Sequence, residues 1–203
     1  MARQGELFPT HSSRGGTAGA TPSSQACPLL GHQLLDWQRH LSAFQQPLFQ
    51  ERAVQAEQQR LFEGDSLTAA ADEPDLNLLL LQPQSLTFWR WPKAPQHGAA
   101  LYFVTDHSTV LQADLLLYVG ETGQAAQRWK GDHDCKSYVA AYSEALARSE
   151  ISSQLSIRFW LDAPRSLRLR RALEQRLIQR WQPPFNKETR QRWATPFTTE
   201  QGS

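Results

Sequence analysis

Two tyrosines, an arginine and a glutamate follow one another in the C-terminal half of the chain. Tyr102 lies in the run ALYFVTD, Tyr118 in LLYVGETG, Arg128 ten residues later, and Glu174 in RALEQRLIQRW. A phenol can orient or deprotonate a water molecule, a guanidinium binds two phosphate oxygens at once, and a carboxylate binds a divalent cation. Together these are groups that hydrolysis of a phosphodiester can use.

Other polar residues lie close to these positions. Gly120 allows either a close approach of the backbone or a simple strand-to-helix turn. Asn186, in the run PPFN, is expected to hydrogen-bond the backbone and support the site. Glu121 and His133 are possible helpers. His133 lies in the run DHDC (132–135), which we interpret as a helix-breaking loop, because four adjacent side chains do not converge on one ion.

Positive charge gathers in the same half of the chain. Residues 90–193 hold 16 basic and 10 acidic residues, whereas the rest of the chain holds 5 and 10. This asymmetry suits a polyanionic partner, although a solvated charged surface has the same composition. The predicted nucleic-acid contacts are Lys130, Arg170, Arg171 and Arg176.

Strands and helices must position these residues. Runs of β-branched and aromatic residues predict strands over 101–105, 115–119 and 155–161. Helices are predicted from the residue after Thr122 to Lys130, over 136–148, and from Ser166 to Trp181. The order of elements predicts an α+β fold with a small antiparallel sheet of about three core strands flanked by helices.

Strand alternation assigns side chains to faces of this sheet. Tyr102 and Val104 are expected on one face of their strand. Leu116, Tyr118 and Gly120 are expected to share a face of the next strand.

The N-terminal half is less regular. An apolar stripe predicts an amphipathic helix over 31–46, which Pro47 should end or kink before a second helix over about 48–63. The runs at 76–82 and 85–91 predict strands. The expected organisation is a disordered terminus (1–30), a helical and strand extension of open role (31–91), a core domain (92–193) and a tail (194–203).

The residues and the order of elements together resemble the GIY-YIG endonuclease family over about residues 99–188. The run YVG is a common form of one family motif, and Arg128 lies eight residues after Gly120, as in the family. The run ALY departs from the other motif, with Ala100 in place of glycine. Glu121 stands where repair-type members often carry lysine.

The resemblance implies an activity. It implies a GIY-YIG fold in a stand-alone, bacterial-type endonuclease that hydrolyses DNA with Mg²⁺ (or Mn²⁺), in DNA repair or in processing of foreign or mobile DNA. Glu174 would ligate the metal, Arg128 would clamp the phosphate, Tyr102 would act as base and Tyr118 would orient the water. One alternative is an impaired GIY-YIG module that binds nucleic acid or protein without cutting. Another is an adaptor that uses the acidic N-terminal half as its interface.

Composition excludes several other classes. The two cysteines, Cys27 and Cys135, make neither a disulfide framework nor a cysteine-rich zinc site, so a reducing cytoplasm is expected. No apolar run reaches the roughly 18 residues of a membrane span, and no secretory signal is expected. We expect no membrane partner and no small-molecule cofactor, and the sequence leaves protein partners open.

Overall fold

The computed structural model describes residues 28–61, 76–86, 97–125 and 134–197, apart from the side chains of 28–29, 52–61 and 134. Its helices are α1 (Pro28–Leu61), α2 (Asp134–Arg148), α3 (Leu167–Trp181) and α4 (Arg190–Trp193), with one 3₁₀-helix, η1 (Leu78–Leu80). Its strands are β1 (Ala100–Ser108), β2 (Ala113–Thr122) and β3 (Ser153–Trp160). The strands expected over 101–105, 115–119 and 155–161 are thereby confirmed, as is the helix expected over 136–148.

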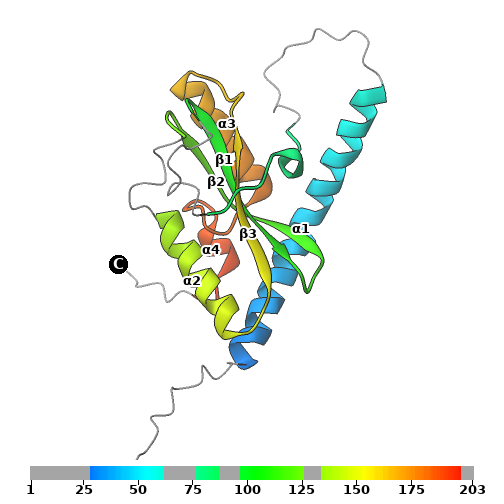
Figure 1. Cartoon of the computed structure of the whole chain (residues 1–203), viewed down its shortest axis with the longest axis vertical. Coiled ribbons are helices and arrows are strands. Elements are labelled where there is room, and N and C mark those ends of the chain that lie inside the picture. The colour runs from blue at the N-terminus through cyan, green and yellow to red at the C-terminus, as the bar shows by residue number, and fades with distance from the viewer. Residues whose placement is uncertain (1–27, 62–75, 87–96, 126–133, 198–203) are drawn as a thin grey trace, which may run out of the picture.

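The three strands form one antiparallel sheet in the order β2-β1-β3. The described residues therefore have an α+β architecture, a small antiparallel sheet flanked by helices (Figure 1). Because β2 is an edge strand, side chains from both faces of the sheet can meet around its outer side.

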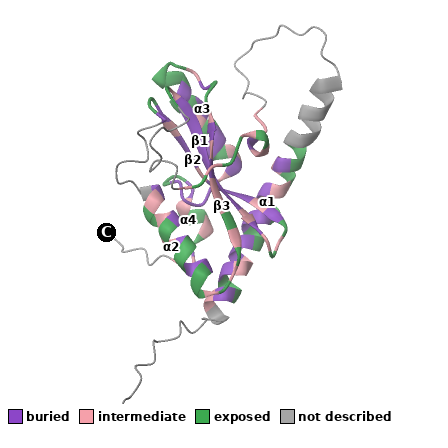
Figure 2. Cartoon of the chain, viewed as in Figure 1, coloured by how far each residue is buried: buried purple, intermediate pink, exposed green. Residues whose placement is uncertain are grey.

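Two apolar clusters cover the two faces of the sheet. Tyr102 and Val104 pack in the cluster that α1 and α2 share, as their alternation predicted. Leu101 and Phe103 pack in the cluster formed with α3. Figure 2 shows the result: β1 and β2 are mostly buried, whereas β3 is mostly intermediate or exposed.

A β-bulge in β2 corrects one predicted face. Val104 pairs with Tyr118 but Thr105 pairs with Leu116, so Leu117 is an extra residue in β2. Leu116 consequently packs in the α3 cluster, whereas Tyr118 packs against the opposite one. The prediction that these two side chains share a face is wrong, because the extra residue inverts the alternation.

The N-terminal extension begins with a single long helix. α1 continues through Pro47, so the prediction of two helices separated there is wrong. Proline removes the hydrogen bond to the carbonyl four residues earlier, which belongs to Ala43. Both residues are exposed, so water can satisfy that carbonyl and the helix continues.

α1 covers part of the backbone at the outer edge of β2. The buried side chain of Gln45 donates to the carbonyl of Leu116 (2.9 Å) and accepts from its N–H (2.8 Å). The same amide nitrogen donates to the carbonyl of Trp181 (3.0 Å). A side-chain amide thus stands where a neighbouring strand would pair, and it ties α1 to β2 and to the end of α3.

The segment before β1 differs from its prediction. Residues 78–80 form η1 and not a strand over 76–82, because the side chain of Asn77 accepts from the N–H of Leu79 (3.0 Å) and turns the chain. Gln84 makes one isolated antiparallel bridge to Ile157 of β3. Most of the strand expected over 85–91 lies outside the described residues.

Of the remaining helices, α3 matches its prediction, whereas α4 was not predicted. α3 follows Ser166 and ends at Gln182, whose backbone is left-handed (φ 47°) and whose N–H bonds the carbonyl of Ile178. Residues 123–125, the start of the helix expected up to Lys130, are not helical, and the rest of that helix lies outside the described residues. Residues 28–30, expected to be disordered, belong to α1, and the other residues of that terminus lie outside the described residues. No helix in the described part of the chain has the length and apolar character needed to cross a membrane.

Candidate functional site

The two motif tyrosines lie next to each other on one face of the sheet. Their rings are stacked, with centroids 5.8 Å apart and planes inclined by 29°. Tyr102, on β1, is completely buried, whereas Tyr118, on the edge strand β2, is partly exposed. The tyrosine that reaches solvent is therefore Tyr118.

Gly120 makes room for the buried tyrosine. It lies in β2 directly opposite Tyr102, and a Cβ atom at this position would lie 2.3 Å from Cζ of that ring. Such a distance is shorter than any van der Waals contact. The close approach of a side chain therefore explains the glycine, and a strand-to-helix turn is not needed to explain it.

Glu174 reaches the same place from the opposite face. It lies on α3, and its Oε1 accepts a hydrogen bond from the N–H of Glu121 (3.0 Å), near the end of β2. It is partly exposed. Since β2 is an edge strand, this carboxylate lies beside the strand and not behind it.

Tyr118 and Glu174 line a single pocket of about 160 Å³, called the Glu174 pocket below. It is lined by Tyr118, Glu174, Gln175, Ile178, Phe185, Asn186, Lys187, Glu188 and Arg190. The structure thus joins two of the four predicted catalytic residues in a polar hollow, with Tyr102 stacked behind one of them.

The far wall of the pocket is the segment 183–193 after α3, called the C-terminal segment. Asn186 is buried there, and its amide accepts from the N–H of Val119 (3.0 Å) and donates to the carbonyl of Val119 (2.8 Å). The N–H of Phe185 also bonds the carbonyl of Leu117 (3.0 Å). Asn186 therefore fixes the C-terminal segment to the outer edge of β2.

Arg170 and Glu121 form an ion pair behind the site. Arg170 is only 3% exposed, and its Nε lies 2.8 Å from Oε2 of Glu121. Its Nη1 donates to the carbonyls of Pro164 (3.0 Å) and Arg165 (3.1 Å). The predicted contact of Arg170 with nucleic acid conflicts with this burial, because the guanidinium binds groups inside the protein. Arg171, whose side chain is 65% exposed, approaches the other oxygen of Glu121 (3.5 Å).

The other predicted site residues divide by where they lie. Arg176 is exposed on α3. Arg128, Lys130 and His133 lie outside the described residues. Lys187 and Arg190 also line the pocket but were not predicted as site residues, although both follow the motif asparagine within about one helical turn.

The donor atoms of the pocket suit one kind of metal ion. Among the described residues, no group of three or more His, Cys, Asp or Glu side chains comes together. Two carboxylates, Glu174 and Glu188, line a hollow open to water, which fits Mg²⁺, an ion that keeps several of its water ligands and binds through one or two carboxylates. A softer metal would call for imidazole or thiolate ligands.

A second tyrosine and carboxylate lie deeper on the same side of the sheet. Tyr142 of α2 donates to Oδ2 of Asp106 on β1 (2.7 Å), and Gln38 of α1 donates to the Tyr142 hydroxyl (2.5 Å). The N–H of Gln154 donates to Oδ1 of Asp106 (3.0 Å). Burial raises the pKa of Asp106 above its usual value and raises the pKa of Tyr142 well above its own. The network joins α1, α2, β1 and β3.

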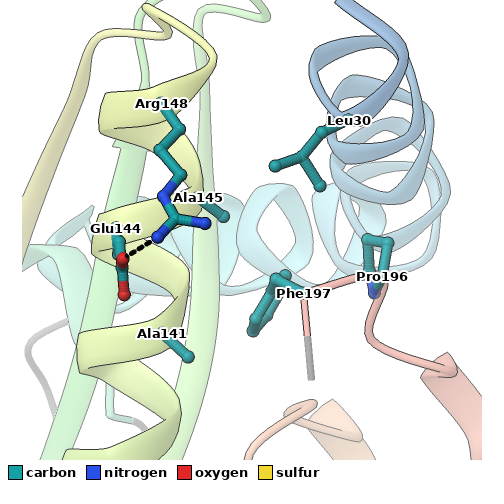
Figure 3. Close-up of a pocket in the computed structure, with 7 residues that line it drawn as sticks. All are labelled: Leu30, Ala141, Glu144, Ala145, Arg148, Pro196 and Phe197. Carbon is teal, nitrogen blue, oxygen red and sulfur yellow. Dashed lines mark hydrogen bonds and ion pairs between the residues drawn. The ribbon is translucent and has the colours of Figure 1, made fainter. Parts of the chain in front are cut away.

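A larger hollow lies away from all the predicted site residues. It has a volume of about 300 Å³ and opens between the start of α1, α2 and the chain after α4 (Figure 3). Leu30, Ala141, Ala145 and Phe197 make its walls apolar, and an ion pair between Glu144 and Arg148 (2.5 Å) lies on one side. Arg148, the cation of this hollow, is paired with Glu144, and none of the predicted site residues lines it.

A scan against protein-family models, a search of curated proteins and a search of solved structures each found no match to this chain.

Proposed function

We propose that this chain is a Mg²⁺-dependent endonuclease of the GIY-YIG type that hydrolyses phosphodiester bonds of DNA. One observation carries the proposal: Tyr118 and Glu174, on different elements and opposite faces of the sheet, line one pocket. The order of motifs along the sequence supports the family, and the basic C-terminal half suits a DNA substrate.

Hydrolysis divides the work among the residues of the pocket. Glu174 would hold Mg²⁺, which supplies a Lewis acid for a phosphoryl oxygen when bound. Water attacks phosphorus as the bond to the 3′ oxygen breaks, giving the 3′-hydroxyl and 5′-phosphate ends expected for the family. The attacking water loses one proton, and the leaving oxygen gains one. Arg128, the predicted clamp, would neutralise the phosphate oxygens.

The two tyrosines have different access to the reacting water. We assign the water-contacting role to Tyr118, because it lines the pocket whereas Tyr102 is completely buried. Tyr102 then holds the ring of Tyr118 in place by stacking. The sequence suggested Tyr102 as the base and Tyr118 as the group that orients the water; because Tyr102 is completely buried, we assign both roles to Tyr118.

Glu121 and Arg170 have a positioning role in this proposal. The N–H of Glu121 binds Oε1 of Glu174 and so fixes the orientation of the carboxylate. Arg170 binds the side chain of Glu121 and two carbonyls of the loop before α3. Partners of this kind orient metal ligands in other metalloproteins and contribute to metal affinity.

Nicking of supercoiled plasmid in Mg²⁺ tests the proposal, with Glu174→Gln as the variant. Glu144→Gln is the matched control, because Glu144 is an exposed helical glutamate that lines the apolar hollow and not the Glu174 pocket. Wild type and the control should nick the plasmid, and Glu174→Gln should bind it without nicking. Binding by wild type without nicking would identify the module that does not cut. Loss of binding by all three proteins would favour the adaptor.

A further inference from the structure

The Glu174 pocket carries two cations to which the proposed chemistry gives no role. Lys187 and Arg190 both line it, from the C-terminal segment, on the wall that faces α3. Lys187 is exposed and Arg190 is partly buried. The other charged residues of the pocket are Glu174 and Glu188, and Oε1 of Glu188 accepts a hydrogen bond from Gln175 (3.3 Å).

Hydrogen bonds to β2 fix the position of the segment that carries both cations. Asn186, the residue before Lys187, pairs with the backbone of Val119, and its carbonyl accepts from the N–H of Arg190 (2.9 Å). The hydroxyl of Thr189 donates to the carbonyl of Pro183. The same strand carries Tyr118, so the position of the cations relative to that tyrosine is set by the sheet.

An aromatic ring orients the guanidinium of Arg190. Its Cζ lies 4.1 Å from the ring centroid of Tyr138, on α2. Stacking engages the face of a guanidinium, whereas its hydrogen bonds are donated in its plane. The stacking on Tyr138 therefore fixes the plane in which Arg190 donates hydrogen bonds, and donation in a plane is the geometry with which a guanidinium binds phosphate.

We propose that Lys187 and Arg190 form a second phosphate subsite, which binds the phosphate next to the scissile one on the same DNA strand. This rests on the proposed function and extends it. The metal ligand and the tyrosine act on one phosphate, and the two cations on the opposite wall bind its neighbour. The substrate is then a strand with at least two consecutive phosphates, gripped without reading of its bases.

Arg190→Gln tests this subsite, and Arg192→Gln is its matched control. Arg192 belongs to the same short helix and also stacks on aromatic rings, with Cζ 4.7 Å from the ring centroid of Phe44, but it does not line the pocket. Two experiments are done on each protein. Plasmid nicking in Mg²⁺ gives the KM and kcat, and binding of an oligonucleotide in Ca²⁺ gives the salt dependence of the affinity.

For Arg190→Gln we expect the KM to rise about tenfold with little change in kcat, because one charge-assisted contact is lost in the ground state and in the transition state alike. The slope of log affinity against log salt should fall by about one. Arg190→Lys keeps the charge and should restore the slope. Arg192→Gln should match wild type in both measurements.

Equal KM and equal salt slope in the Arg190→Gln and Arg192→Gln proteins would overturn the subsite. So would a fall in kcat without a rise in KM, because that result would assign Arg190 to the scissile phosphate. If wild type binds DNA but does not nick it, the nuclease proposal fails, and the salt slopes still decide whether Arg190 binds a phosphate.

Discussion

Two tyrosine–carboxylate pairs lie on this sheet and differ in their access to water. The buried pair, Tyr142 and Asp106, is closed on all sides, and both side chains have partners inside the protein. The pocket pair, Tyr118 and Glu174, lies at the outer edge of β2 and lines a hollow. Each pair combines a phenol with a carboxylate, so placement relative to the edge of the sheet accounts for their different access to water.

The two pairs differ in what their surroundings allow: burial suits one pair to structural support, and access to water suits the other to a reaction. Proton transfer to or from a substrate needs a group that a substrate can touch. In the buried pair, burial disfavours the charged form of both groups, which raises both pKa values and stabilises the neutral network. In the pocket pair, the carboxylate accepts a hydrogen bond from a backbone N–H beside the hollow, an arrangement suited to a metal ion.

The largest expected effect comes from filling the space between the strands at Gly120. Gly120→Ala should destabilise the protein by about 3 kcal/mol, because the new methyl overlaps the ring of buried Tyr102 and that ring must move. It should also reduce nicking, since the movement displaces Tyr118. Gly123→Ala is the control, because a Cβ added at this position would lie 3.8 Å from the nearest atom, on Arg170. Urea unfolding measures both variants, and equal stabilities would contradict the close approach.

Removal of the hydroxyl of Tyr118 should lower the kcat of nicking and leave the stability of the protein nearly unchanged. Tyr118→Phe keeps the ring that stacks on Tyr102, so the free energy of unfolding should change by less than about 1 kcal/mol. The kcat of nicking should fall about 100-fold, the typical contribution of a positioned acid or base. Nicking kinetics at saturating plasmid give the answer. An unchanged kcat would remove Tyr118 from the reaction.

Removal of the hydroxyl of Tyr142 should lower the stability of the protein and leave the kcat of nicking unchanged. Tyr142→Phe leaves Oδ2 of Asp106 and the amide of Gln38 without this partner inside the core. The free energy of unfolding should fall by about 2 kcal/mol, and kcat should stay the same. Urea unfolding beside the nicking assay measures both quantities. A fall in kcat with unchanged stability would reverse the comparison between the two pairs.

The sequence predicted the sheet well because its strands follow local rules. β1 and β3 are rich in β-branched and aromatic residues, and their alternation places Tyr102 and Val104 correctly. β2 departs at Leu117, where the bulge coincides with tertiary contacts that a local pattern does not contain. Gln45, far away in the chain, binds the backbone of Leu116, and Phe185 binds that of Leu117.

The candidate site shows the same limit. Motif spacing singled out Glu174 and Tyr118, which line one pocket. Composition did not distinguish a buried arginine from an arginine on the surface. Arg170 belongs to a basic run and reads as surface, yet its pairing with Glu121 takes it into the interior. Arg190 lies in a polar run after the last predicted helix, and the pairing of Asn186 with β2 brings it to the pocket. In both cases, a contact between residues far apart in the sequence sets where the arginine lies.

The smallest expected effect is a pH dependence of stability that belongs to the buried pair. Burial raises the pKa of Asp106 in the folded protein, so its contribution to stability is complete below the pKa of the unfolded chain, about 3.9, and is lost as the pH rises through the folded value. The free energy of unfolding of wild type should therefore decrease, relative to that of Asp106→Asn, as the pH rises from about 4. Urea unfolding of both proteins across this range measures the difference. A difference that stays constant, or that changes in favour of wild type, would mean that the carboxyl ionises as easily inside the protein as in water, and the contrast with the open carboxylate of Glu174 would then be lost.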